Sequence, residues 1–258
     1  MIHESLEPPN PTWRAHGAAW AARCVAWLWG EEGGRAREYL HNRGLHDGVL
    51  RTFNVGYNPC DTWEDHEQWG LPKPDRGAGD QGRKRIWIPR GITFPWYVEG
   101  ELWRLNIRRP LTPAQIAAGE TKYIGPAGFA NALYNAGSVR AGRPVVLVEG
   151  EIDALTVVQA CGEQIAAVAT GSTCGARRGA WVARLALAPV VLVAFDADKC
   201  GADGSPGAGD CAAAWWCNAL PNALRWRPLL HDVNSLPDPE DVRSWVLRGL
   251  ERAQHPVT

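Results

Sequence analysis

Apolar residues recur at helical spacing through the first fifty positions of the chain. Residues 13–29 are rich in alanine and tryptophan, with the spacing of a largely buried helix that ends at Gly30. Shorter helices are predicted over 35–43 and 47–53. Segment 54–82 is rich in proline, glycine, asparagine and aspartate, which predicts turns and loops.

Two different strand patterns follow. Between residues 86 and 135, short runs of β-branched and aromatic residues (IWIP, ITFPWYV, ELWRLNIRR, TKYIG) predict a small, mostly antiparallel sheet. After residue 144, the continuous apolar runs VVLV, AAVA and VVLVAF are typical of buried parallel strands. Helical patterns lie between and after these runs, at 152–161, 177–187 and 208–219. The alternation predicts βαβ units.

The predicted fold class is therefore α/β. It combines an α+β N-terminal subdomain with a subdomain built on a central, mostly parallel sheet flanked by helices. The predicted divisions are a helical extension, a subdomain with a basic sheet, the α/β subdomain and a C-terminal helix, at residues 1–34, 35–140, 141–238 and 239–258 respectively.

Composition adds a constraint on nucleic-acid binding. The 258 residues include 27 basic and 28 acidic side chains, so the net charge of −1 excludes a uniformly basic coat protein. The basic residues are nevertheless concentrated, with Arg or Lys at 83, 84, 85, 90, 104, 108 and 109 opposed only by Glu99 and Glu101. Either this is a solvated sheet surface or it is a face that binds nucleic acid. Trp87, Trp96 and Trp103 lie among the arginines, as core residues or as platforms for unpaired bases.

Cysteine usage and hydropathy bear on metals and compartment. None of the seven cysteines forms a C-x-x-C pair or has a histidine at zinc-finger spacing, so no zinc is expected. The first residues do not form a signal peptide, and no window of eighteen apolar residues exists. We expect a cytoplasmic protein with reduced thiols and no membrane partner.

Acidic residues stand where two of the predicted parallel strands end. Glu149 follows the first of these strands, while Asp196 and Asp198 follow the third and point the same way by alternation. If the two strands are neighbours, the three carboxylates converge and repel one another. A bound Mg²⁺ or Mn²⁺ ion usually neutralises such repulsion. The alternative is that these acids merely cap the following helices.

These residues carry a resemblance to a known domain. Val148-Glu149-Gly150-x-x-Asp153 with Asp196-x-Asp198 resembles the Toprim domain of bacterial-type primases, topoisomerases, OLD-type nucleases and recombination proteins. Upstream, the chain is similar in order to the catalytic core of DnaG-type primases, from about residue 35 to 240. The motifs are A-x-x-Y-L-x-x-R-G-L from Ala36, F-x-x-G-Y-x-P from Phe53, Phe94-Pro95 and K-Y-I-x-P from Lys122.

The resemblance implies roles for individual residues. Glu149 would act in acid/base chemistry or metal positioning, and Asp196 and Asp198 would bind the metal. Supporting residues would be Asp153, Gly150, Thr170, Gly171, Asp232 and Asn234. The basic region that holds template or nucleotide would comprise Arg85, Arg90, Arg104, Arg108, Arg109 and Lys122.

The implied activity is metal-dependent synthesis of short RNA primers from NTPs on a single-stranded DNA template. Acidic residues in the second half and basic ones in the first predict a cleft with walls of opposite charge. The chain departs from the family in lacking a zinc module and a helicase-binding domain, and in its glycine-rich stretch after Asp198. A replicative helicase or a separate initiation module is therefore an expected partner, and the origin is expected to be phage-like or a mobile element.

Two other functions stay open. A Toprim nuclease or topoisomerase fragment is disfavoured because all five tyrosines precede the Toprim half and no P-loop is present. A non-catalytic nucleic-acid-binding module is disfavoured because a dead site has no physical reason to keep repelling carboxylates together.

Overall fold

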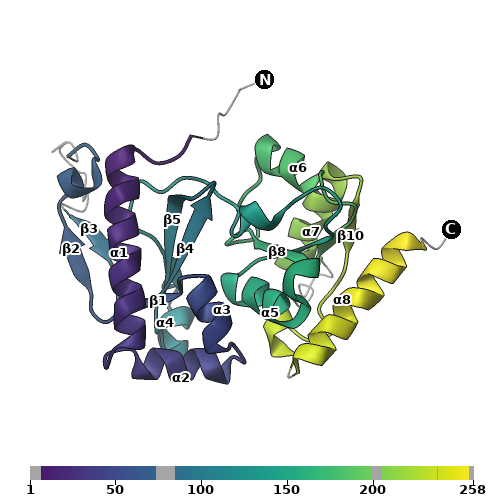
Figure 1. Ribbon diagram of the computed structural model, residues 1–258, viewed down its shortest axis with the longest axis horizontal. Helices are drawn as coiled ribbons and strands as arrows, with labels where there is room; N and C mark the ends of the chain where they lie inside the picture. Colours follow the sequence, from purple (N-terminus) through teal and green to yellow (C-terminus); the bar gives the residue numbers. More distant parts are fainter. Residues whose placement is uncertain (1–6, 74–84, 199–204, 237, 256–258) are drawn as a thin grey trace. The chain divides into compact units, whose positions relative to one another are not determined.

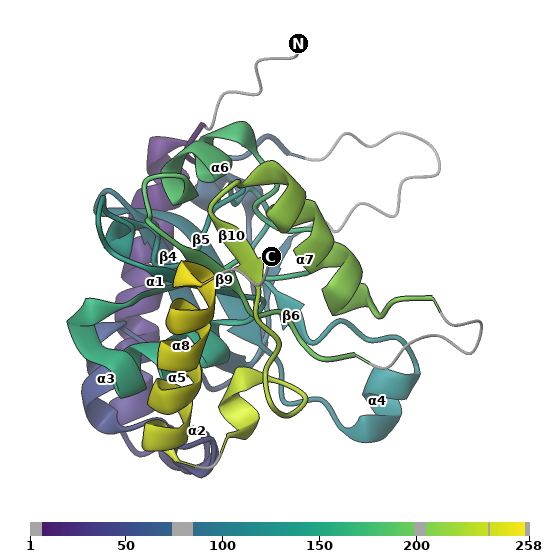
Figure 2. The ribbon, with the colours of Figure 1, turned by 90° about the vertical axis from the view of Figure 1, so that its right-hand side faces the viewer.

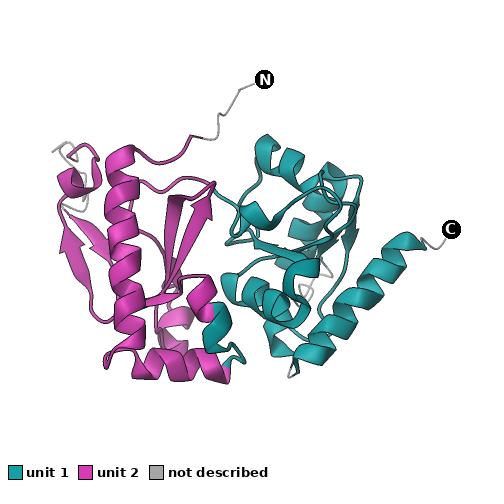
Figure 3. Ribbon diagram, in the orientation of Figure 1, with its two compact units in different colours: residues 1–4, 43–49, 132–258 teal, residues 5–42, 50–131 magenta. Residues whose placement is uncertain are grey.

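The chain forms two compact units, seen in the computed structural model (Figures 1 and 3). The structure describes residues 7–73, 85–198, 205–236 and 238–255. Unit 1 takes its described residues from 43–49 and from 132 onward; unit 2 comprises the others up to 131. Positions 74–82 of the predicted turn-rich segment lie outside the described residues, as do Arg83, Lys84 and positions 199–204 of the glycine-rich stretch.

Unit 2 combines helices with two antiparallel sheets. Its helices are α1 (Pro11–Trp29), α2 (Gly34–Asn42) and α4 (Pro113–Ala117), and α3 (Asp47–Thr52) runs from one unit into the other. The main sheet has the order β1-β4-β5-β6, formed by Gly56–Asn58, Gly91–Val98, Glu101–Arg108 and Tyr123–Ile124. A separate pair joins β2 (Thr62–Glu64) to β3 (Ile86–Ile88).

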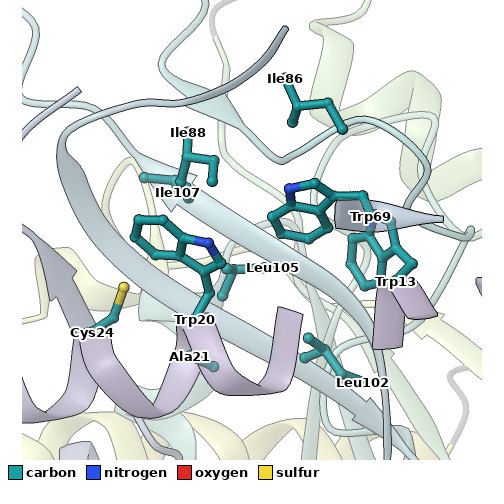
Figure 4. Close-up of a cluster of buried hydrophobic side chains, with 10 residues drawn as sticks. All are labelled: Trp13, Trp20, Ala21, Cys24, Trp69, Ile86, Ile88, Leu102, Leu105 and Ile107. Carbon is teal, nitrogen blue, oxygen red and sulfur yellow. The ribbon is translucent and has the colours of Figure 1, made fainter. Parts of the chain in front are cut away.

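Helix α1 supplies a large part of the unit 2 core. Asn10 caps it by accepting a 2.8 Å hydrogen bond from the Trp13 amide, and Pro11 occupies the first turn. Its buried face places Trp13, Trp20 and Cys24 against strands β3 and β5 (Figure 4). Gly56 of β1 permits close packing on α1, because a Cβ there would stand 2.7 Å from Cys24 Cβ.

Unit 1 is a parallel sheet covered by helices. The order is β10-β9-β7-β8, with β7 at Val145–Val148, β8 at Ala166–Ala169, β9 at Val191–Val193 and β10 at Ala223–Arg225. The helices are α5 (Glu151–Cys161), α6 (Gly179–Leu185), α7 (Ala208–Ala219) and α8 (Pro239–Gln254). Figure 2 shows α8 alongside α5, and the two helices are in contact. Within the described residues, no helix has both the length and the apolar character needed to cross a bilayer.

The predicted fold class is confirmed, with several local corrections. Strand β2 lies in the segment predicted to be turns, and helix α4 interrupts the region predicted to form an antiparallel sheet. Strand β1 also lies in the segment predicted to be turns, because Gly56 and Asn58 disfavour strands and outweigh Tyr57. Tertiary contacts support it, since Asn58 Nδ2 donates to Ile88 O and Pro89 O. Strand β3 pairs with β2 instead of joining the main sheet. Strand β10 was not predicted, because it is a half-exposed edge strand of three residues.

Candidate active site

The three carboxylates predicted to converge come from adjacent strands. β7 pairs directly with β9 in parallel, so the segments that follow these strands leave the same edge of the sheet. The Glu149 carboxylate is hydrogen-bonded to the backbone of Asp196. Burial raises the pKa of Glu149 to about 7, and the charges of Asp196 and Asp198 act in the same direction. The structure therefore brings Glu149 together with both aspartates.

Among the residues that the structure describes, none forms a hydrogen bond with the buried Oε1 of Glu149. An orphaned carboxylate oxygen among other carboxylates is an energetic cost that a divalent cation would remove, so this donor set fits a hard, oxygen-binding metal ion. Within the described residues, no group of three or more Asp, Glu, His or Cys side chains is arranged so that it could hold a metal ion as it stands. Asp196 Oδ2 also lies 3.8 Å from His231 Nε2.

The capping alternative holds for one of the three carboxylates. Asp198 Oδ2 accepts a 3.0 Å hydrogen bond from the Gly209 amide in the first turn of α7, eleven positions further along the chain. The first helix after Glu149 is instead capped by Gly150, and no side chain caps it. The N-terminus of α7 thus binds one carboxylate oxygen of Asp198, whereas the Glu149 carboxylate does not cap the helix that follows it.

Asp153 and the Asp232-x-Asn234 motif form a supporting network. Asp153 Oδ1 accepts from the Asn234 amide at 2.9 Å, and Asn234 Nδ2 donates to Thr156 Oγ1 and to Arg43 O, both at 2.7 Å. Burial and then the Asp232 charge raise the pKa of Asp153 to about 7. These contacts hold the 3₁₀ turn 233–235 against α5, a structural role for Asp153.

The loop after β8 is tied to the strand that carries Glu149. The Gly171 amide donates to Glu149 O at 2.7 Å, and Gly171 has a φ of +77°, a region that favours glycine. Thr170 Oγ1 donates to Ser172 O at 2.8 Å, which closes the turn. Thr170 and Gly171 therefore position the Glu149 backbone.

Two of the predicted basic residues of unit 2 share a cavity. Arg90 and Arg108 line a space of about 430 Å³ together with Arg35, Tyr39 and Tyr57. The Arg108 guanidinium stacks on the Tyr39 ring, 4.6 Å from its centroid. Three arginines and two phenol rings make this cavity suited to an anionic ligand with an aromatic part. Arg35 was not among the sequence candidates, because it lies in the helical segment before the strands.

The other predicted basic residues are engaged elsewhere. Arg85 pairs with Asp65 at 3.1 Å, Arg109 pairs with Glu120 at 2.8 Å, and Lys122 is exposed. Arg104 stacks on Trp96 and Phe129 with ring distances of 4.8 and 4.7 Å. Trp96 and Trp103 are buried, so they are core residues, whereas Trp87 is half-buried beneath Arg109.

The fold has known relatives among solved structures, although no protein-family model and no curated protein matches the sequence. The RNA polymerase domain of Mycobacterium tuberculosis primase DnaG, solved with a double-stranded DNA oligomer bearing a 6-nucleotide overhang, superposes with a TM-score of 0.67 at 22% identity, covering 93% of this chain and 80% of that one. A DNA primase domain from Pseudomonas aeruginosa gives 0.68 at 23%, covering 92% and 78%. This is the fold of a DnaG primase catalytic core.

A third structure of this fold is a DnaG primase catalytic domain bound to single-stranded DNA, with a TM-score of 0.62 at 20% identity and coverage of 93% and 78%. In each case the match extends over nearly all of this chain, so both units belong to the shared primase-core fold. The resemblance inferred from scattered motifs is thereby confirmed at the level of the fold.

Several charged residues around the carboxylates escaped sequence reasoning. Arg225 and Asp210 form an ion pair at 2.9 Å, and Asp210 also pairs with Arg227. A cavity beside Asp198 is lined by Arg227 and His231. The only sequence signal was the Arg-Trp-Arg run at 225–227, which gives no hint of its proximity to residues thirty positions earlier.

Proposed function

We propose that the protein is a Toprim-type, metal-dependent nucleotidyltransferase that synthesises short RNA primers from NTPs on single-stranded DNA. The observation that carries the proposal is the buried, unpartnered oxygen of Glu149 beside Asp196 and Asp198, in a primase-core fold. A carboxylate cluster of this kind suits polymerisation, because that reaction needs a divalent cation to neutralise the charge of the triphosphate.

Glu149, Asp196 and Asp198 would hold Mg²⁺ or Mn²⁺, which when bound neutralises triphosphate charge and makes the attacking 3′-hydroxyl more acidic. Glu149 Oε1 would be available for this role, because it has no hydrogen-bond partner within the described residues. Asp198 keeps one oxygen on the Gly209 amide and has the other for the ion.

The arginines of unit 2 would hold nucleic acid or nucleotide. Arg35, Arg90 and Arg108 supply positive charge for phosphates, the term that dominates affinity for single strands. Tyr39 and Tyr57 offer ring faces in the same cavity. Arg85 and Arg109 contribute less, because each already has a carboxylate partner.

Primer synthesis tests the proposal. With single-stranded DNA, NTPs and Mg²⁺, the protein should produce short labelled oligoribonucleotides, and EDTA should abolish them. Asp196→Asn combined with Asp198→Asn should remove the product while leaving the protein folded. Product that persists in this variant would refute the site assignment. Metal-dependent nicking without synthesis would instead support the Toprim nuclease, and DNA binding unaffected by EDTA with neither reaction would support a binding module.

A further inference from the structure

Arg225 is the last residue of β10 and lies opposite Val193, the last residue of β9. Beyond Val193 the chain leaves the ladder and continues as the segment that carries Asp196 and Asp198. The Val193 carbonyl still accepts a 3.0 Å bond from the Trp226 amide, but within the described residues no backbone amide bonds the carbonyls of Phe195 and Asp196. A buried carbonyl without a hydrogen-bond donor is energetically costly, so other donors must take the place of the missing strand amides.

The Arg225 side chain supplies these donors. Its Nη1 donates to Val193 O at 3.0 Å and to Phe195 O at 2.9 Å, and its Nη2 lies 3.4 Å from Asp196 O. One guanidinium therefore bridges three carbonyls, including that of a proposed metal ligand. The planar, five-donor fork of arginine suits this task, and the single nitrogen of lysine does not.

Asp210 holds the other edge of the guanidinium. Its Oδ1 accepts from Arg225 Nε at 3.1 Å and Nη2 at 2.9 Å, and the Asp210 side chain is only 14% exposed. Asp210 lies in the first turn of α7, beside Gly209, whose amide binds Asp198. The ion pair thus joins the end of β10 to the helix turn that fixes Asp198.

The charge of Arg225 also matters at the carboxylates. It opposes the repulsion among Glu149, Asp196 and Asp198, and it lowers the pKa of Glu149 against the larger effects that raise it. None of Arg225's hydrogen bonds within the described residues goes to these three carboxylates. Arg225 can therefore offset their charge while leaving their oxygens available.

We propose that Arg225, anchored by Asp210, is a positioning residue that sets the geometry of the Asp196–Asp198 segment for metal binding. The inference rests on the proposed function, because it assigns that segment to the metal. Residues that orient metal ligands in this way typically contribute about 10- to 100-fold to metal affinity or activity.

Direct Mn²⁺ binding, followed by the electron paramagnetic resonance signal of free Mn²⁺, is the test. We expect Arg225→Gln to raise the Mn²⁺ dissociation constant about 10- to 100-fold and Arg225→Lys to raise it less. The half-saturating Mg²⁺ concentration for primer synthesis should rise in parallel, with the rate at saturating metal largely recovered. A purely structural role would lower the rate through loss of folded protein and leave the half-saturating concentration unchanged.

Arg184→Gln is the matched control, since Arg184 donates to Ala136 O at 3.1 Å in the same unit. It should bind Mn²⁺ as the wild type does. Wild-type affinity in both Arg225 variants would overturn the inference while leaving the proposed function intact. If Arg225→Gln fails to fold, the Mn²⁺ dissociation constant of Arg225→Lys alone tests the inference. That variant keeps the positive charge but lacks the forked guanidinium donors. Wild-type Mn²⁺ binding that survives Asp196→Asn with Asp198→Asn would instead overturn the proposed metal site, and the inference with it.

Discussion

Gly209 of α7 lies so close to Asp196 that a Cβ on the glycine would stand 2.2 Å from the Asp196 carbonyl oxygen. The same glycine donates its amide to the carboxylate of Asp198 at 3.0 Å. The helix start and the strand exit are therefore packed directly on one another, with no room for a side chain between them.

Gly209→Ala should consequently displace the segment that carries the two aspartates. We expect primer synthesis to fall at least about tenfold, as is usual when the groups that hold metal ligands in place are disturbed. The control is Gly179→Ala in α6, where an added Cβ meets no atom within 4 Å. This control should keep full activity and gain about 0.4–1 kcal/mol of stability. Equal activity of the two variants would contradict the packing argument.

The pKa of Glu149 predicts a pH-dependent stability in the metal-free protein. Its value of about 7 in the folded state lies above the ordinary 4.5, so the folded state binds more protons than the unfolded state between these pH values. The free energy of unfolding should therefore fall as pH rises through this window. Glu149→Gln should remove this contribution and be more stable than the wild type at pH 8 by about 1–2 kcal/mol, after allowing for partial exposure.

Chemical denaturation at pH 5 and pH 8 measures the difference, in EDTA and again in excess Mg²⁺. Asp153 contributes a similar slope and is present in both proteins, so the comparison isolates Glu149. In Mg²⁺ the wild type should recover stability through ligand binding while the Gln variant should not. If the free energy of unfolding depends on pH in the same way in both proteins, the raised pKa of Glu149 is contradicted.

Arg108 should contribute to the affinity for single-stranded DNA. Arg108→Ala should weaken binding at low salt and reduce the slope of log affinity against log salt by about 0.7, the value for one phosphate contact on a single strand. Arg23→Ala is the control, because Arg23 is also stacked on an aromatic ring, 4.1 Å above Trp20, yet does not line the cavity of Arg35, Arg90 and Arg108. Identical salt slopes for the two variants would contradict a role for that cavity.

Glu64 should be a stability determinant of unit 2. Its carboxylate accepts from the indoles of Trp20 and Trp69 at 2.9 Å and lies 2.8 Å from His16 Nε2. Glu64→Gln turns an amide NH₂ toward these donors and should cost about 2–4 kcal/mol. Glu67→Gln, at an exposed residue paired with Lys73, should cost less than about 1 kcal/mol. Urea denaturation followed by tryptophan fluorescence compares them.

The sequence predicted most elements and the convergence of carboxylates because those features depend on local pattern. Continuous apolar runs located β7 and β8 to the residue, and Glu149 and Asp196 could be placed at strand ends from the chain alone. The sequence analysis missed β1, β2, α4 and β10, which are short elements that depend on tertiary contacts such as the bonds of Asn58 in β1.

The supporting groups were also hidden from sequence reasoning. Nothing along the chain connects Arg225 with the carbonyl of Phe195, or Arg35 with Arg108, because these pairs form only when distant segments fold together. Conversely, Arg85 and Arg109 looked like free cations in the sequence, but each has an acidic partner in the structure.

The most direct test of the central claim follows the DNA template and the RNA product in the same reaction. A single-stranded DNA template with a fluorescent 5′ end is incubated with the protein, Mg²⁺ and radiolabelled NTPs, and the products are resolved by length. We predict new, short, radiolabelled oligoribonucleotides with the template unchanged, and no such product from the Asp196→Asn, Asp198→Asn variant. A shortened template without labelled product would contradict primer synthesis at these carboxylates.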